Sequence, residues 1–117
     1  MTKTSLSTLV EEQLTAARDS GSGRSAHTVY GGHQHSLRQT IIALTAGTAL
    51  ADHESPGDAT LQVLHGHVRL TSVDAHCDAA AGDHVVIPPC RHGLEAVDDS
   101  VVMLTVVKSV RPEERNP

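Results

Sequence analysis

The chain has 117 residues, of which 38% are hydrophobic and 20% charged, and its formal net charge is −5. This balance is typical of one folded domain and not of a disordered chain. Because the charge is negative and no Lys/Arg cluster is present, nucleic acid and anionic membranes are excluded as expected partners. The apolar runs are too short to span a bilayer, and no signal-peptide pattern is visible, so we expect a cytoplasmic protein.

Two features of the composition bear on function. Tyr30 is the only aromatic residue apart from the nine histidines, so the core must be aliphatic and a pocket would lack aromatic walls. The histidines raise the expectation of a metal site, although surface histidines are common. Cys77 and Cys90 form no CxxC pattern, and we expect two free thiols.

The first predicted element is a helix over residues 4–18, since apolar residues recur on one helical face. Thr8-x-x-Glu11 resembles a capping box near its start. Residues 19–23, Asp-Ser-Gly-Ser-Gly, are expected to end the helix and act as a linker. A helix this short is marginal alone, so it should pack on the outside of the domain that follows or on a partner chain.

From residue 26 onward the pattern changes to short β-prone runs broken by Gly, Pro and Asp. The predicted strands are 27–30, 37–44, 48–51, 60–64, 67–71, 84–87, 93–97 and 100–108. About eight short strands without intervening helices predict an all-β sandwich or barrel. The run 101–107 is apolar on both faces and should be buried on both. We therefore divide the chain into a helix and linker (1–25), a β-barrel (26–108) and a flexible tail (109–117).

Two glycine-led segments carry a resemblance to a known family. The first has Gly47, then His53 after five residues, Ser55, Ala59 and finally Gly66. This frame resembles the first cupin motif, G-x5-H-x-H-x3-E-x6-G, with Ser55 at the second histidine and Ala59 at the glutamate. Gly66 follows a strand at a tight hairpin, where a positive φ is expected.

The second segment resembles the second cupin motif, G-x5-P-x-G-x2-H-x3-N. Gly82 and Pro88 match that pattern, Cys90 stands in place of its glycine, and His92 comes one residue before its histidine. Fifteen residues separate the two segments, as in small bacterial cupins. The resemblance covers residues 26–108 and implies an all-β cupin fold, the jelly-roll barrel also called a double-stranded β-helix.

The resemblance also implies where a metal would lie. In metal-bearing cupins, histidines and a carboxylate from several strands bind Fe, Mn, Ni, Zn or Cu inside the barrel. Here His53 and His92 are the surviving ligands by position. Ser55 would share the inward face of His53 but coordinate poorly, and Ala59 offers only a methyl group. Replacement ligands could come from Asp58, His33 or His35, with Glu54 as a weaker alternative. Cys90 lies in the loop that carries His92, so its thiolate is a further alternative, although a structural cysteine is the preferred interpretation.

Three functions remain open at this stage. The first is a barrel that binds a small polar or anionic ligand, with or without a metal, through Arg38, Gln39, His53 and His92. The second is a metal-dependent cupin enzyme of the dioxygenase, isomerase or decarboxylase type. The third is a structural or assembly barrel. Cupins commonly pair through sheet faces, and the doubly apolar last strand agrees with a covered face, so we expect a homodimer.

Overall fold

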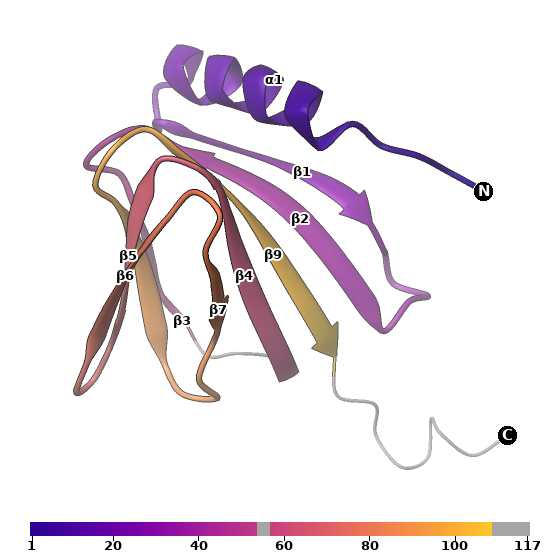
Figure 1. Cartoon of the computed structure of the whole chain (residues 1–117). Helices are drawn as coiled ribbons and strands as arrows, with labels where there is room; N and C mark the ends of the chain where they lie inside the picture. The colour runs from indigo at the N-terminus through magenta and orange to yellow at the C-terminus, as the bar shows by residue number, and fades with distance from the viewer. Residues whose placement is uncertain (54–56, 109–117) are drawn as a thin grey trace, which may run out of the picture.

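The computed structural model describes residues 1–53 and 57–108 and contains one helix followed by nine strands (Figure 1). Helix α1 spans Leu6–Asp19, and the Oγ of Ser5 caps it by accepting a hydrogen bond from the backbone N–H of Thr8, at 3.3 Å. The expected capping box at Thr8 and Glu11 is therefore wrong, because Thr8 already lies inside the helix. The cap is the hydroxyl residue three positions earlier.

The strands form two hairpin-rich antiparallel sheets. They are β1 (Arg24–Tyr30), β2 (Leu37–Leu44), β3 (Ala49–His53), β4 (Gly57–His65), β5 (His67–Ser72), β6 (His76–Ala80), β7 (His84–Val86), β8 (His92–Ala96) and β9 (Ser100–Lys108). The five-stranded sheet has the order β1-β2-β9-β4-β7 and the four-stranded sheet the order β3-β8-β5-β6. The two sheets face each other around an aliphatic core, which confirms the all-β prediction.

Strand β6 is absent from the sequence prediction. Its sequence, His-Cys-Asp-Ala-Ala, has no β-branched or aromatic residue apart from histidine. It is a strand because it pairs with β5 at five successive positions in a tight hairpin. Cross-strand pairing here overrides a weak local preference.

The outer face of the five-stranded sheet is covered by α1. Leu9, Leu14 and Ala17 of the helix form a buried cluster with Ile41 and Ala43 of β2 and with Val101 and Met103 of β9. This confirms two-sided burial for residues 101–103 of β9, whereas Val107 near its end is 42% exposed. Because the cover is the chain's own helix, the two-sided burial does not by itself require a partner chain.

Three glycines of the cupin-like frame adopt the left-handed conformation. Gly47, Gly66 and Gly82 have φ of 85°, 84° and 96°. A Cβ on Gly66 would also collide with the backbone oxygen of Asp99 and the side chain of Ser100. The positive φ expected at Gly66 is confirmed, and the glycine frame is thus a requirement of the backbone.

Asp99, in the turn between β8 and β9, connects three segments. Its Oδ2 accepts a hydrogen bond from Nε of Arg18 on α1 at 2.9 Å, and its Oδ1 accepts one from the backbone N–H of Ala46 at 2.8 Å. The hydrogen bond from Ala46, followed by that from Arg18, lowers the pKa of the Asp99 carboxyl. Across residues 1–53 and 57–108, no helix combines the length and apolarity needed to cross a membrane.

Candidate functional site

His92 is a buried histidine at the start of β8. Its side chain is 6% exposed, and its Nδ1 lies 3.0 Å from the backbone oxygen of Cys90. A carbonyl oxygen can only accept a hydrogen bond, so Nδ1 of His92 is the donor in this contact. The loop that contains Cys90 therefore fixes the orientation of the imidazole.

The space inside the barrel beside His92 is small and aliphatic. A cavity of about 30 Å³ is lined by His92 and by seven aliphatic side chains, Ile42, Leu50, Leu61, Leu70, Ile87, Leu94 and Leu104. A volume of about 30 Å³ is close to the share of one water molecule in the liquid. This interior cavity is thus too small for a ligand much larger than one water molecule.

The register of β3 and β8 places His53 directly opposite His92. The two histidines that the motif resemblance selects are therefore neighbours across the sheet at the level of the backbone. The side chain of His53, together with Glu54 and Ser55, lies outside the described part of the chain.

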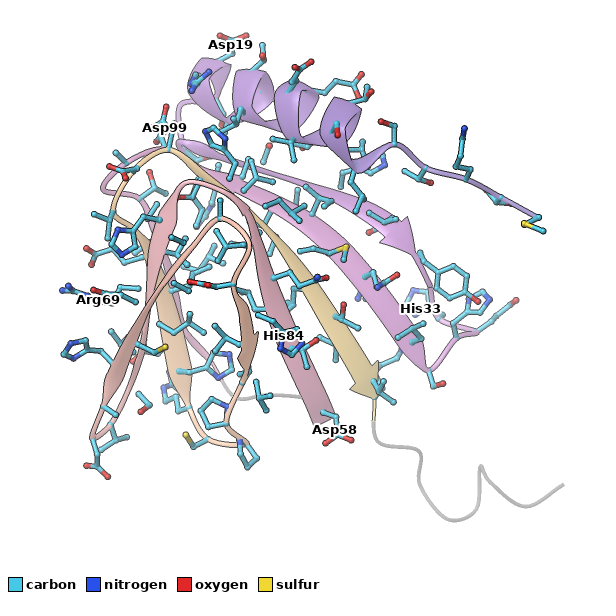
Figure 2. The ribbon with its side chains drawn as sticks, in the orientation of Figure 1. Asp19, His33, Asp58, Arg69, His84 and Asp99 are labelled. Carbon is cyan, nitrogen blue, oxygen red and sulfur yellow. The ribbon has the colours of Figure 1, made fainter. Side chains whose placement is uncertain are left out.

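Other candidate ligands lie apart from His92. Ala59 is 7% exposed and faces the core, as its place in the motif implies. Its neighbour Asp58 is exposed on the opposite face of β4, because side chains alternate along a strand. His33 and His35 are exposed in the loop between β1 and β2, where the ring of His35 lies 5.0 Å from that of Tyr30. Figure 2 shows His33 at the far end of this hairpin, away from the four-stranded sheet.

Arg38 and Gln39 are consecutive residues of β2 and face opposite sides of the sheet. Arg38 is exposed and lies on the face of Ile42 and Leu44, whereas Gln39 lies on the outer face. Nε2 of Gln39 donates a hydrogen bond to Oγ1 of Thr105 at 3.3 Å. The two side chains therefore cannot bind one ligand inside the barrel together.

The described side chains do not fit a metal ion held by three protein ligands. Among the described side chains, those of residues 1–52 and 57–108, no three His, Cys, Asp or Glu come together in a way that could hold a metal. The small interior cavity beside His92 has otherwise aliphatic walls, whereas Fe, Mn, Ni, Zn and Cu require nitrogen, oxygen or sulfur donors. The described residues therefore do not by themselves form a metal centre.

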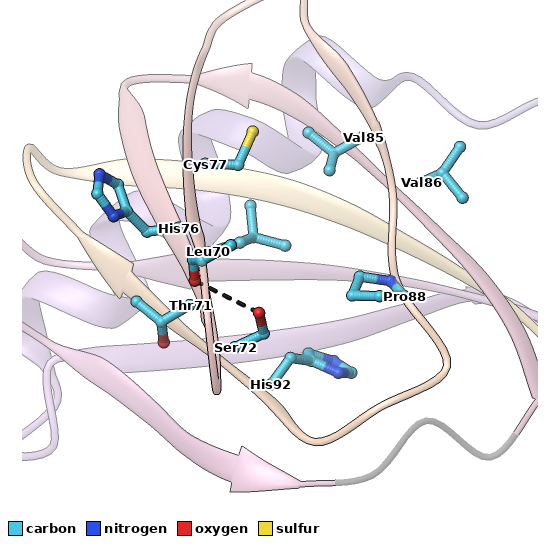
Figure 3. Close-up of a pocket in the computed structure, with 10 residues that line it drawn as sticks. Leu70, Thr71, Ser72, His76, Cys77, Val85, Val86, Pro88 and His92 are labelled. Atoms are coloured by element: carbon cyan, nitrogen blue, oxygen red, sulfur yellow. Dashed lines mark hydrogen bonds between the residues drawn. The ribbon is translucent and has the colours of Figure 1, made fainter.

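A larger cavity of about 220 Å³ opens between β6 and β7 (Figure 3). We call it the β6–β7 cavity. Leu70, Val85, Val86 and Pro88 form its aliphatic walls, and its polar lining consists of Thr71, Ser72, His76, Cys77 and His92. His92 borders both this cavity and the small interior one. Leu70 also lines both cavities, so among the described residues these two side chains separate the core from the open cavity.

The sequence prediction missed the β6–β7 cavity because it missed β6. The available signal was alternation: Cys77 and Ala79 are apolar, and they alternate with the polar His76 and Asp78. In the structure Cys77 lines the cavity and Ala79 is buried, as period two requires. Both cysteines are free and exposed, as expected.

The two sheets, folded over one aliphatic core, define a small jelly-roll barrel. No family model matches the sequence, and no curated protein is similar to it. Solved structures do match. A conserved protein of unknown function from Streptococcus pyogenes is 28% identical, with a TM-score of 0.69, over 79% of this chain and 80% of that one. An RmlC-like cupin from Desulfovibrio desulfuricans is 25% identical, with a TM-score of 0.63, over 72% and 81%.

A cupin superfamily protein from Desulfitobacterium hafniense is 14% identical, with a TM-score of 0.68, over 74% of this chain and 78% of that one. The chain therefore has the fold of the cupin superfamily, which confirms the resemblance seen in its glycine frame.

Proposed function

We propose that this chain is a binding barrel of the cupin fold, and that its ligand places a small aliphatic group in the β6–β7 cavity. The observation that supports this is the cavity itself, about 220 Å³ in volume, open to solvent between two sheets and walled mainly by aliphatic side chains. That volume corresponds to roughly seven water molecules. It is below the roughly 300–1,000 Å³ typical of pockets for drug-sized ligands.

The lining changes the expected ligand chemistry. The sequence predicts a polar or anionic ligand held by Arg38, Gln39, His53 and His92. The cavity has no Lys or Arg among its lining residues, so an anion would lose hydration without a matching cation. An aliphatic group with a neutral polar end suits it better, because Thr71, Ser72 and His92 supply hydroxyl and imidazole groups beside the apolar wall.

A titration with small probes tests this proposal. Isobutanol and isobutyramide should shift the backbone amide NMR signals of residues that line the β6–β7 cavity, whereas isobutyrate should bind more weakly. Cys77→Phe fills the cavity and should abolish the shifts. Val97→Phe makes a similar change at an exposed residue that does not line the cavity, and it should leave them intact. Equal responses of both variants would contradict the proposal.

A metal-dependent enzyme is the second candidate, and the pairing of His53 with His92 favours it. Such a centre would need donors beyond the described side chains. Elemental analysis of protein purified without chelators, compared with a His53→Ala/His92→Ala variant, decides the matter. Near-stoichiometric Fe, Mn, Ni, Zn or Cu that is lost in the variant would support this candidate. Protein that also fails to take up added metal would remove it.

A further inference from the structure

The β6–β7 cavity lies between two strand edges. β6 is the edge strand of the four-stranded sheet, and β7 is the edge strand of the five-stranded sheet. In the described part of the chain, β6 pairs only with β5, and β7 pairs only with β4. An unpaired edge presents backbone groups that can bond to another strand.

The hydrogen bonds between β5 and β6 show which backbone groups of β6 face the cavity. The N–H of Ser72 donates to the oxygen of Ala75 at 2.8 Å, which fixes the phase of the β5–β6 hairpin. In an antiparallel ladder, every second residue exchanges both hydrogen bonds with its partner strand. Cys77, two residues after Ala75, therefore bonds to β5. The N–H and C=O groups of His76 and Asp78 face away from β5.

The same reasoning applies to β7. The N–H of Ile87 donates to the oxygen of Ala59 at 3.0 Å, so Val85 bonds to β4. The backbone groups of His84 and Val86 consequently face away from β4. Val86 is also 71% exposed. The cavity thus has outward-facing backbone groups on both of its long sides.

The turns on either side of β6 carry carboxylates. Asp74 lies in the turn between β5 and β6, beside the lining residues Ser72 and Ala75. Asp83 lies in the turn between β6 and β7, and its Oδ2 accepts a hydrogen bond from the backbone N–H of Ala80 at 2.9 Å. Both are exposed. Among the described residues no Lys or Arg lines the cavity, although Arg91 lies next to His92 in sequence, so these turns favour positive charge on an occupant.

We infer that the occupant of the β6–β7 cavity is an extended polypeptide segment that adds to β6 as a further strand. One aliphatic side chain of the segment enters the cavity, and basic residues flank it. An added strand continues the face of Cys77 and Ala79, so its inward side chains reach the space beside Leu70. This inference rests on the proposed function, since it names the molecule that carries the aliphatic group.

The peptide acetyl-Lys-Thr-Val-Thr-Lys-amide matches this geometry. With its valine opposite Cys77, its two threonines lie opposite His76 and Asp78 and exchange the backbone hydrogen bonds. In a titration of ¹⁵N-labelled protein, the amide signals of His76 and Asp78 should shift. Methylation of both threonine nitrogens removes two donors and should weaken binding at least about tenfold.

Methylation of the valine nitrogen is the matched control, because that N–H points away from β6 and its loss should leave binding unchanged. Replacement of the valine by aspartate, of both lysines by glutamate, or of Cys77 by Phe in the protein should each reduce binding, while Val97→Phe should not. Equal affinity of the threonine-methylated peptide would overturn strand addition. Loss of binding on methylation of the valine nitrogen would overturn this register of the peptide on β6.

The small probes separate this inference from the proposed function. If isobutanol and isobutyramide shift the cavity signals but the peptide does not, the peptide inference falls and the binding barrel stands. If neither shifts them, both proposals fall.

Discussion

The side of the barrel under α1 and the side between β6 and β7 differ in how far the chain completes its own contacts. Under α1, the outer face of β2 and β9 is buried by the helix, and Asp99 joins Arg18 to the backbone of Ala46. Between β6 and β7, two strand edges stay unpaired in the described chain, and an aliphatic cavity is open to solvent. We infer that the first side supplies stability, and that the second can change its contacts without loss of the fold.

The sharpest test of this difference removes aliphatic atoms from each side. Ile41 is fully buried between α1 and the sheet. Its replacement by Ala should lower the unfolding free energy by about 2–5 kcal/mol. Val86→Ala, on the exposed edge strand β7, should change it by less than about 0.5 kcal/mol. Urea unfolding followed by circular dichroism measures both. Similar losses would mean that the two sides do not differ as described.

A glycine pair gives the next largest effect. Gly66→Ala should lower the unfolding free energy by about 1–3 kcal/mol, because a non-glycine residue must adopt φ near 84° against the backbone of Asp99. Gly21→Ala is the control, since nothing lies within 4 Å of its added Cβ. The same urea titration applies. A Gly66 variant as stable as the Gly21 variant would show that the hairpin relaxes freely.

The Asp99 contact gives a smaller and pH-dependent effect. Asp99→Asn keeps an oxygen for Ala46 but loses the ion pair with Arg18, so the loss should stay below about 1 kcal/mol for this partly exposed pair. The pKa of Asp99 is lower in the folded than in the unfolded chain, so its ionised form stabilises the fold. That stabilisation is complete above the unfolded pKa, at roughly pH 4, and is lost as the pH falls through the folded value.

Stability curves of the native chain and Asp99→Asn should therefore differ at neutral pH and converge in acid. A constant difference across this range would mean that the charge of Asp99 contributes nothing.

The smallest effect on stability is expected for substitutions on the part of the outer face of β2 and β9 that α1 does not cover. Leu37 and Val107 are register partners there and are 37% and 42% exposed. The homodimer predicted from the sequence remains a prediction, and light scattering tests it against the 12.3 kDa of one chain. If this face holds the dimer together, Leu37→Asp should halve the measured mass while urea unfolding, at matched protein concentration, still shows a folded chain. A monomeric native chain would contradict the prediction.

More of the fold than of the candidate site can be predicted from the sequence, for physical reasons. Strands 37–44 and 100–108 were predicted with the bounds of β2 and β9, because long β-branched runs have no competing structure. The glycine positions could be predicted because positive φ is a local requirement. The cavity depends on β6, whose residues have a weak preference for β-structure. It also depends on the gap between the edge strands of the two sheets, which is set by the whole fold and not by any one segment.

The candidate side chains show the same limit. Arg38 and Gln39 were grouped because they are adjacent polar residues, but alternation along β2 separates them. Asp58 and Ala59 are separated in the same way, whereas His53 and His92 are brought together by a register between distant strands.

The position of β9 also affects how the chain folds. β9 follows every other described strand in sequence, yet it is the middle strand of its sheet, between β2 and β4. Without β9 the five-stranded sheet separates into two hydrogen-bonded pairs, β1 with β2 and β4 with β7. Part of the surface on which α1 packs is also missing then, because Val101 and Met103 belong to β9. During synthesis the helix therefore emerges long before its docking surface is complete, and closure of the barrel waits for pairings between segments far apart in sequence, which form slowly.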